Sequence, residues 1–236
     1  NMKSDEHGNK AQSLSAETQK LHSCNCPPDR MLLYAVTDRA WLNGRSLYSD
    51  VQEALKGGAT MIQLREKDLD YGQFLTEAIE LKELCAQYNV PLIINDNIDI
   101  ALACNADGVH LGQSDLAASE ARLRLGENKI IGISAQTVEQ AIAAQQDGAD
   151  YLGVGAVFTT STKKDADFVS YDVLKDICAS VAIPVCAIGG IYKHNIMQLA
   201  GSGIDGVALV SAIFAAKDIE KECNELLSLS KRMVRA

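Results

Sequence analysis

From residue 31 onward the chain alternates short apolar runs with longer amphipathic segments. Each run is too short for a helix and lacks the strict apolar–polar alternation of a half-exposed strand. Such runs are typical of parallel strands that are covered on both faces. The intervening segments, such as 71–88 and 137–146, place apolar residues three and four positions apart, which predicts helices. The expected strands are eight, over 32–37, 60–64, 92–95, 108–111, 130–134, 151–155, 185–188 and 206–210.

A weak internal repeat supports this alternation. A short motif closes a helical segment and opens an apolar run at Gly58-Ala59-Thr60, Asn105-Ala106-Asp107, Gly148-Ala149-Asp150 and Gly203-Ile204-Asp205. Gly and Asn suit the left-handed residue that ends many helices. The motif recurs every roughly 43 to 55 residues, the length of two strand–helix units. Four such pairs predict an α/β fold, a single (β/α)8 TIM barrel. A doubly wound open sheet is less favoured, because no Gly-x-Gly-x-x-Gly turn follows the first run.

The first 30 residues differ from the rest. They are polar, show no clear period and end in Pro27-Pro28, which predicts a flexible N-terminal extension. We therefore expect two parts: an extension over 1–30 and a catalytic barrel domain over 31–236. One domain suffices for the second part, since α/β barrels of about 200–250 residues commonly fold as one.

Composition narrows the possible functions. The chain of 236 residues has 22 Lys and Arg against 31 Asp and Glu, a net charge of −9, which disfavours nucleic acid as a partner. An anionic ligand would need a local cluster of cations and backbone N–H groups. No apolar stretch is long enough to cross a membrane, and we see no signal-peptide core. The seven cysteines, an odd number and mostly within apolar runs, predict reduced thiols in a cytoplasmic protein.

In barrels of this kind the active site lies at the carboxyl ends of the strands. After the second run, Gln63 and Arg65 are expected to point the same way, with Lys67 two residues further on. Two converging cations suit a phosphate or diphosphate. The alternative is a solvated loop in which residues 65–68 pair with one another.

Two carboxylates follow the next strands. Asp96 comes after the third run, beside Asn95, and Asp115 after the fourth. Together with the nearby cations they predict a Mg²⁺ site, because Mg²⁺ is usually held by one or two carboxylates plus phosphate oxygens and water. Taken singly, each is also an ordinary turn residue, and Asp115 is a candidate cap for a helix beginning at Leu116.

A second anion-binding region is expected at strands six to eight. The loop after the sixth run is rich in hydroxyls and cations, Gly189-Gly190 follows the seventh, and Val210-Ser211 opens the last helix after the eighth. Paired glycines allow close backbone approach, and a helix N-terminus presents free N–H groups. Ser134 leaves a small hydroxyl at the rim after the fifth run. Two anionic substrates meeting over one barrel mouth explain both regions.

Two further side chains give less information about function. His110 alternates within the fourth run, which favours a hydrogen-bonded residue of the core or rim over a general base. Trp41 either packs over a ligand ring or covers the barrel edge. No Cys/His or Ser/His/Asp set emerges from the spacing, so the sequence does not indicate covalent catalysis.

Several of these segments together resemble the thiamine-phosphate synthase family. The resemblance spans about residues 31–232 and rests on Tyr34-Ala35-Val36-Thr37-Asp38-Arg39, Gln63-Leu64-Arg65-Glu66-Lys67, Ile94-Asn95-Asp96, Asp107-Gly108-Val109-His110-Leu111-Gly112-Gln113-Ser114-Asp115, Thr160-Ser161-Thr162-Lys163 and Ile188-Gly189-Gly190-Ile191. It implies a (β/α)8 barrel that joins a pyrimidinylmethyl diphosphate to a thiazole phosphate, or its carboxylated form, with Mg²⁺, giving thiamine phosphate and diphosphate by a dissociative substitution.

The resemblance also implies roles for residues. Arg65, Lys67, Asn95 and Lys163 would hold the pyrimidine diphosphate, with Gln63 alongside. Asp96 and Asp115 would hold Mg²⁺, and Ser134 would lie by the pyrimidine. The catalytic set is then Arg65, Lys67, Ser134 and Lys163. The thiazole phosphate would be bound by Thr160, Thr162, Gly190, Val210 and Ser211, and Ser161 is a further expected substrate-binding residue.

One departure and two alternatives accompany the resemblance. Ala156 and Thr159 stand where the family often has proline, which predicts a looser loop there. The related thiazole tautomerase, a similar barrel without a metal, would not need the carboxylates and cations together. A catalytically silent barrel that senses a phosphorylated metabolite is the alternative from another class. We expect a monomer or a small homo-oligomer.

Overall fold

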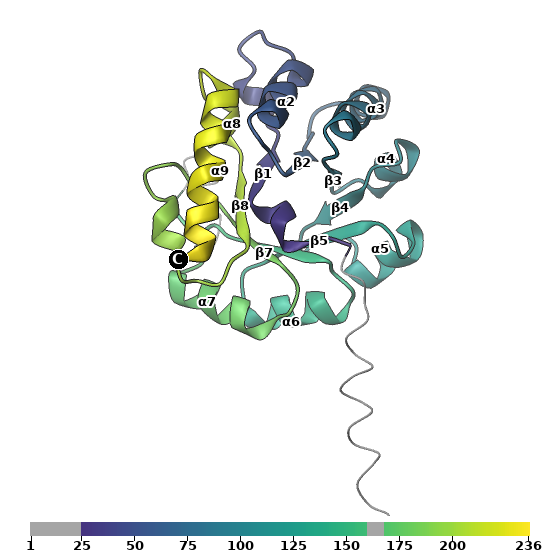
Figure 1. Ribbon diagram of the computed structural model, residues 1–236. Helices are drawn as coiled ribbons and strands as arrows, with labels where there is room; N and C mark the ends of the chain where they lie inside the picture. The colour runs from purple at the N-terminus through teal and green to yellow at the C-terminus, as the bar shows by residue number, and fades with distance from the viewer. Residues whose placement is uncertain (1–24, 160–167) are drawn as a thin grey trace, which may run out of the picture.

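The computed structural model describes residues 25–159 and 168–236, and its parallel strands close into a barrel in chain order (Figure 1). Each strand pairs with the next, and β1 pairs with β8. The prediction of a (β/α)8 TIM barrel is therefore confirmed, and each predicted strand agrees with the observed one to within a residue at either end. The strands are β1 (Leu33–Val36), β2 (Met61–Leu64), β3 (Leu92–Asn95), β4 (Gly108–Leu111), β5 (Ile130–Ala135), β6 (Tyr151–Val154), β7 (Val185–Ile188) and β8 (Gly206–Leu209).

Helices surround this ring of strands (Figure 1). Most begin at a side chain that accepts a hydrogen bond from the first turn, such as Ser46, Asp70 and Thr137, which satisfies a backbone N–H that the helix leaves unpaired. The helices are α2 (Leu47–Lys56), α3 (Tyr71–Gln87), α4 (Ile98–Ala103), α5 (Ala118–Leu125), α6 (Val138–Gln146), α7 (Tyr171–Ser180), α8 (Ser211–Phe214) and α9 (Ile219–Arg235), with 3-10 turns η1 (Pro28–Met31), η2 (Arg39–Trp41) and η3 (Ile196–Leu199).

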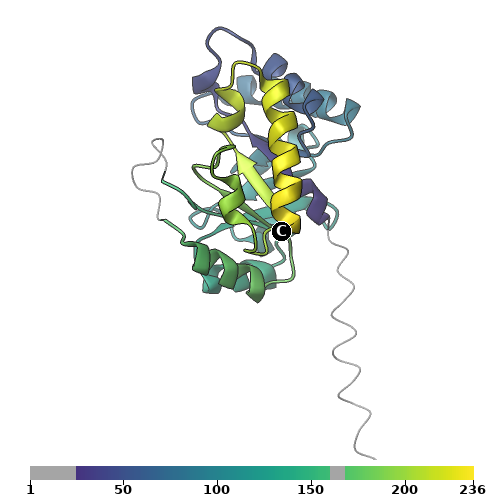
Figure 2. The ribbon, with the colours of Figure 1, turned by 60° about the vertical axis from the view of Figure 1, so that its left-hand side comes forward.

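The helical layer departs from the ideal repeat at two places. The 3-10 turn η3 joins β7 to β8 in place of an α-helix. The expectation that Val210-Ser211 opens the last helix was wrong, because Ser211 begins the short α8 and α9 follows. In Figure 2, α9 runs along the outside of the barrel, and it contacts β1, β8 and α2.

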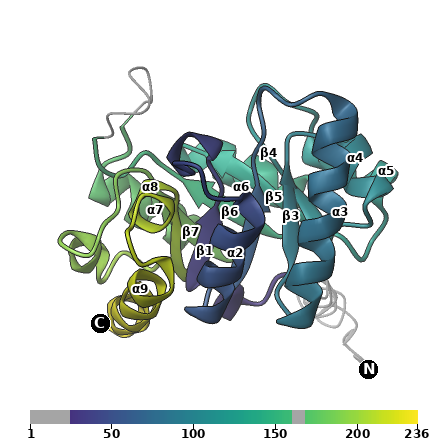
Figure 3. The ribbon, with the colours of Figure 1, turned by 90° about the horizontal axis from the view of Figure 1, so that it is seen from above.

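Side chains alternate between two apolar cores. Outward-facing residues such as Ile62 and Val109 pack under the helices, whereas inward-facing residues such as Met61 and Ile93 fill the barrel. Figure 3, in which the molecule is seen from above, shows strands and helices side by side, for example β3 and α3. The turn before each second strand takes the predicted left-handed conformation, with positive φ at Gly58, Asn105, Gly148 and Gly203. The alternation decides which polar residues enter the barrel.

The N-terminal end of the barrel is closed by residues just before β1. Cys26 and Met31 are fully buried and belong to the interior core, and η1 contacts β1, β7 and β8. Gly206 is needed here, since a Cβ would lie 1.8 Å from the carbonyl oxygen of Met31. The predicted boundary between residues 30 and 31 thus falls inside η1, and the described residues from 25 onward pack on the barrel. Residues 1–24 of the predicted extension lie outside the described residues.

Candidate active site

Three of the expected site residues meet at the carboxyl ends of β2 and β3. The Lys67 ammonium donates to Asn95 Oδ1 at 3.1 Å and to Asp96 Oδ2 at 2.7 Å. The Asp96 backbone N–H donates to the carbonyl of His110 at 2.9 Å, which ties this end of β3 to β4. Asp96 adopts a φ of 61°, a conformation that a short polar side chain tolerates. Sequence positions 67, 95 and 96 therefore form one polar cluster.

Gln63 points into the barrel, as its place in the strand predicts. It is 5% exposed, accepts from Asn95 Nδ2 at 3.0 Å and donates to the Tyr34 hydroxyl at 2.8 Å. Arg65 follows at the strand end, where its backbone N–H donates to Thr37 Oγ1 at 3.0 Å.

The alternative of a self-paired loop over residues 65–68 does not describe this segment. Glu66 pairs with Arg39, after β1, at 3.3 Å, and Lys67 pairs with Asp96. Both contacts cross to another strand end. The loop is therefore anchored across the rim of the barrel.

Asp115 lies in the loop after β4. Its Oδ2 accepts from the Gly112 backbone N–H at 2.6 Å. It does not cap the next helix, because α5 begins at Ala118 with Ala117 as its N-cap residue. In the same loop, Gln113 donates to the backbone carbonyl of Ser134 at 2.8 Å.

Asp96 and Asp115 thus stand after neighbouring strands. Among the described residues, no group of three or more His, Cys, Asp or Glu side chains could hold a metal ion. Any ion held here would therefore rely on a ligand or on water for most of its coordination.

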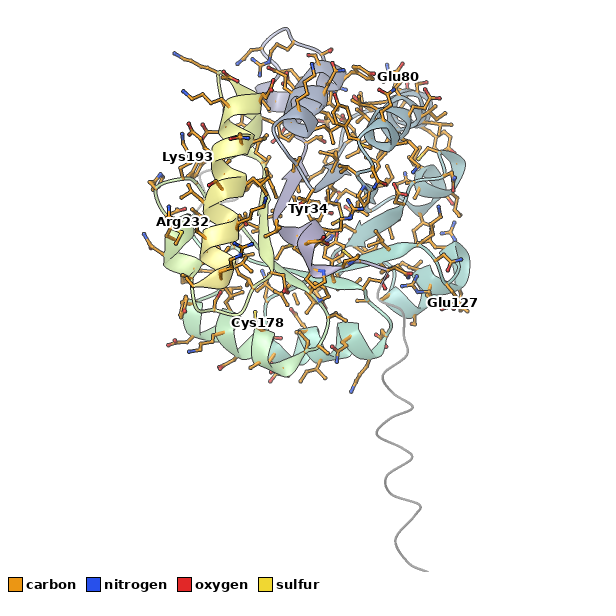
Figure 4. All side chains as sticks on the ribbon, viewed as in Figure 1. Tyr34, Glu80, Glu127, Cys178, Lys193 and Arg232 are labelled. Carbon is orange, nitrogen blue, oxygen red and sulfur yellow. The ribbon has the colours of Figure 1, made fainter. Side chains whose placement is uncertain are left out.

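Ser134, His110 and two tyrosines complete the polar interior. Ser134 Oγ and Tyr151 OH each lie 2.8 Å from a ring nitrogen of His110, which confirms the expectation of a hydrogen-bonded histidine. Tyr34 and Tyr151 share a hydrogen bond of 2.7 Å. Burial raises the pKa of both phenols well above its ordinary value. Figure 4 shows Tyr34 inside the ring of strands, whereas Lys193 and Arg232 lie at the periphery.

The two tyrosines were missed by the sequence reasoning. Each sits in an apolar run, where an aromatic residue ordinarily indicates core packing. One available signal was Gly132, a glycine in the middle of a strand, which often marks a close approach of another group. A Cβ at Gly132 would lie 2.0 Å from the Tyr151 ring.

The second expected region is partly described. After β7, Gly189 and Gly190 both have positive φ, and the Gly190 carbonyl accepts from Asn195 Nδ2 at 2.8 Å. After β8, Ser211 Oγ lies 2.6 Å from the Tyr192 hydroxyl. Tyr192 joins the two strand ends and was not identified from the sequence. The predicted binding residues Thr160, Ser161, Thr162 and Lys163 lie outside the described residues.

Trp41, in η2, covers the edge of the barrel. It is partly buried against the outer core, and its indole N–H has no hydrogen-bond partner among the described residues. This supports the edge-covering alternative for Trp41.

A closed barrel with polar side chains gathered at the carboxyl ends of its strands defines the class: a (β/α)8-barrel enzyme. Comparison with known proteins gives the family. The sequence model described as "Thiamine monophosphate synthase" matches residues 33–213. The chain belongs to this family, whose enzymes are transferases of thiamine biosynthesis.

Relatives and solved structures agree with this assignment. The chain is 51% identical over 194 residues to the thiamine-phosphate synthase of Clostridium tetani, covering 82% of this chain and 93% of the relative. It is 52% identical over 197 residues to that of Ruminiclostridium cellulolyticum, covering 84% and 94%. The structure of thiamine phosphate pyrophosphorylase from Pyrococcus furiosus superposes with a TM-score of 0.81 and 38% identity, covering 87% of this chain and 98% of that one.

The family reaction condenses a pyrimidine diphosphate with a thiazole phosphate. This chain is accordingly an enzyme, a transferase of thiamine biosynthesis. The thiazole tautomerase alternative finds no support among these relatives, which are named thiamine-phosphate synthases. No helix in the described part of the chain is long and apolar enough to cross a membrane.

Proposed function

We propose that the chain joins 4-amino-2-methyl-5-(diphosphooxymethyl)pyrimidine to 4-methyl-5-(2-phosphooxyethyl)thiazole, or its carboxylated form, across one barrel mouth. The observation that supports this arrangement is the position of Lys67, which follows β2 and whose ammonium donates to Asn95 and Asp96 at the end of the neighbouring strand β3. In this arrangement, the pyrimidine diphosphate lies at β2 to β5, and the thiazole phosphate lies at β6 to β8.

The positive charges that bind the diphosphate are those of Arg65, Lys67 and Lys163. Arg65 offers a planar fork to phosphate oxygens, and Lys67 supplies a mobile point charge. The Lys67 side chain is 46% exposed, so it is accessible to a ligand in the mouth. Asn95 is held by its bonds to Gln63 and Lys67 and thereby keeps the ammonium in place. This local cluster counters the net negative charge of the chain.

The carboxylates Asp96 and Asp115 would hold Mg²⁺. The donor set fits, because two carboxylates completed by phosphate oxygens and water is a common way to bind this ion. In the structure, the Asp96 carboxylate already accepts a cation, the Lys67 ammonium, and its side chain is 35% exposed. One Asp115 oxygen is engaged by Gly112, which orients the carboxylate. When bound, Mg²⁺ would neutralise charge on the diphosphate leaving group.

The thiazole phosphate would be bound by Thr160, Ser161, Thr162, Gly190, Val210 and Ser211. Support comes from the loops after β7 and β8, which form the usual phosphate site of barrel enzymes. The Tyr192 hydroxyl beside Ser211 Oγ fixes the rotamer of the serine. Gly190 brings the backbone close to Phe158 and Thr159, since a Cβ would lie 2.8 Å from Phe158 Cβ.

The chemistry we propose is dissociative. The bond between the pyrimidine methylene carbon and the diphosphate oxygen breaks, and diphosphate leaves with the electron pair. The resulting pyrimidinylmethyl cation is captured by the thiazole nitrogen, which forms the new C–N bond. With the carboxylated thiazole, the carboxylate also leaves as CO2, and the ring carbon keeps the electron pair and takes a proton from water. Such a reaction needs anion stabilisation and correct positioning more than a general base. The cations at β2 and the oriented groups at β3 to β5 supply both.

We propose a cytoplasmic enzyme, supported by five buried or half-buried cysteines that are free thiols: Cys85, Cys104, Cys178, Cys186 and Cys223. We also propose that the protein is a monomer or a small homo-oligomer.

The test is to mix both substrates with the protein and Mg²⁺ and to detect thiamine phosphate by mass. We expect product only with Mg²⁺, and slower turnover at limiting Mg²⁺ in Asp96→Ala and Asp115→Ala. Unchanged activity in both variants would contradict the metal assignment. A silent sensor would bind the thiazole phosphate yet release no diphosphate under any condition.

A further inference from the structure

An unbroken chain of hydrogen bonds runs through the barrel from one side of the proposed pyrimidine site to the other. It begins at Lys67, passes down into the fully buried tyrosine pair and rises again to Ser134. The consecutive distances are 3.1 Å for Lys67–Asn95, 3.0 Å for Asn95–Gln63, 2.8 Å for Gln63–Tyr34, 2.7 Å for Tyr34–Tyr151, 2.8 Å for Tyr151–His110 and 2.8 Å for His110–Ser134. Such lengths are those of well-formed hydrogen bonds.

The lysine end fixes the direction of the first bonds. An ammonium has donors and no acceptor, so Lys67 must donate to the side-chain carbonyl of Asn95. The other end of the Asn95 amide is then an NH₂ group, which donates to the Gln63 carbonyl. By the same reasoning, the NH₂ group of Gln63 donates to the Tyr34 hydroxyl. The lysine thus removes the usual ambiguity between amide oxygen and nitrogen.

The tyrosine pair continues in the same direction. In the described part of the structure the Tyr34 hydroxyl bonds to Gln63 and to Tyr151. It accepts from Gln63, so its single proton goes to the Tyr151 hydroxyl. The opposite direction would leave the Tyr34 proton without an acceptor at a fully buried site, which costs about 1–3 kcal/mol. The Tyr151 hydroxyl therefore donates its own proton to the hydrogen bond with His110.

The histidine then has one allowed tautomer. His110 Nδ1 accepts from Tyr151, so the ring proton is on Nε2 and is donated to Ser134 Oγ. The serine hydroxyl accepts this bond and keeps its own proton for another partner. Its backbone carbonyl is held by Gln113. Ser134 is therefore presented to the barrel mouth as a hydrogen-bond donor.

The surrounding packing is built for this arrangement. Burial raises the pKa of Tyr34 and of Tyr151, so both phenols keep the protons that the chain of bonds requires. Gly132 leaves room for the Tyr151 ring, and a Cβ at Gly153 would lie 3.2 Å from His110 Cε1. The Tyr151 and His110 rings lie 5.5 Å apart. The packing around the two rings therefore favours the same side-chain positions as the hydrogen bonds.

We propose that Gln63, Tyr34, Tyr151 and His110 form a one-way hydrogen-bond relay that is set by the Lys67 ammonium and holds Ser134 as a donor to a ring nitrogen of the pyrimidine substrate. The inference rests on the proposed function for the place of the pyrimidine. The three interior residues Tyr34, Tyr151 and His110 are positioning residues, because they act through Ser134. An aminopyrimidine carries ring nitrogens that accept hydrogen bonds, so the relay matches the serine to that ring. A reversed relay would direct the serine proton to His110.

The test reads the relay without substrate. In the full chain labelled with ¹⁵N-histidine, NMR should show His110 as the Nε2–H tautomer alone. Tyr151→Phe removes the donor to Nδ1 and should introduce the second tautomer. Lys67→Met should do the same from the far end of the relay. Tyr171→Phe, which loses a hydrogen bond to Ala200 outside the barrel, is the matched control and should leave His110 unchanged.

Kinetics supply the second readout. Tyr151→Phe should raise KM for the pyrimidine diphosphate about five- to tenfold, the effect of one hydrogen bond, and leave KM for the thiazole phosphate unchanged. Ser134→Ala should match that KM yet keep the single His110 tautomer. His110→Gln carries an acceptor and a donor in one amide and should retain more activity than His110→Leu.

The outcomes separate the relay from the proposed function. His110 found as the Nδ1–H tautomer in the parent protein overturns the relay, as does a single unchanged tautomer in both Tyr151→Phe and Lys67→Met. An unchanged KM in Ser134→Ala, with the tautomer as expected, instead contradicts the placement of the pyrimidine beside Ser134.

Discussion

Gly132 in β5 offers the sharpest test of how the barrel interior is packed. A Cβ at this position would lie 2.0 Å from Cζ and 2.3 Å from the hydroxyl of Tyr151, far inside van der Waals contact. Tyr151 is fully buried, so the ring cannot swing into solvent. In Gly132→Ala either the ring or the strand must move, and the Tyr151 bonds to Tyr34 and His110 are broken or stretched.

The size of the effect follows from these two consequences. Overpacking a well-filled core costs about 1–3 kcal/mol. Leaving a buried polar group without its partner costs about 1–3 kcal/mol more for each group. Counting one buried group left without its partner, we therefore expect Gly132→Ala to lower the free energy of unfolding by about 2–6 kcal/mol. This is a large fraction of the roughly 5–15 kcal/mol that stabilises a typical protein.

The assay is urea unfolding followed by circular dichroism, with Gly72→Ala as the matched control. Gly72 lies in the first turn of α3, and a Cβ there would lie 3.6 Å from Asp70 Oδ1, an ordinary contact. Alanine favours a helix by up to about 1 kcal/mol over glycine, so this control should be neutral or slightly stabilising. If Gly132→Ala costs no more than Gly72→Ala, the reasoning about the interior is wrong.

Three further outcomes are expected. Burial, together with the neighbouring Glu66, raises the pKa of Glu77 from 4.5 to about 8 against the opposing charge of Arg39. The folded protein then keeps a proton that the unfolded chain releases, so stability falls as pH rises from about 4.5 to 8 by up to about 1.4 kcal/mol per pH unit. Glu77→Gln should remove that part of the slope in urea unfolding at several pH values. Lys163→Ala should slow diphosphate release in single-turnover experiments more than it weakens thiazole-phosphate binding, and kinetics equal to the parent would remove that role. Tyr192→Phe should raise KM for the thiazole phosphate about two- to tenfold without changing that for the pyrimidine, and equal changes in both would contradict its place beside Ser211.

The strands were predictable because each is short, apolar and buried on both faces. The helical layer was less predictable from the sequence. Residues 196–199 form only a 3-10 turn between β7 and β8, since a closed barrel requires a connection there but not an α-helix. Cys26 was assigned to the extension because its neighbours are polar, yet it is buried in the barrel. Burial of one residue in a polar segment leaves no periodic signal.

The part of the site that was predictable is the set of polar residues that directly follow the strands. Lys67, Asn95 and Asp96 meet as expected, because parallel strands bring their carboxyl ends to one rim. The contacts of Tyr34 and Tyr151 were not predictable, because an aromatic residue in an apolar run has the same pattern whether or not its hydroxyl is used. Arg39 and Glu66 pair across strands, and such pairing depends on register rather than on local sequence.

The most direct test of the central claim is calorimetric titration of each substrate alone, with Mg²⁺ present, into Asp96→Ala and Ser211→Ala. If the barrel mouth has two separate binding regions, each variant should lose affinity for one substrate only. Asp96→Ala should weaken binding of the pyrimidine diphosphate by about tenfold or more and leave the thiazole phosphate unaffected, while Ser211→Ala should do the reverse. The account would be contradicted if either variant weakened the binding of both substrates equally. It would also be contradicted if neither variant weakened the binding of either substrate.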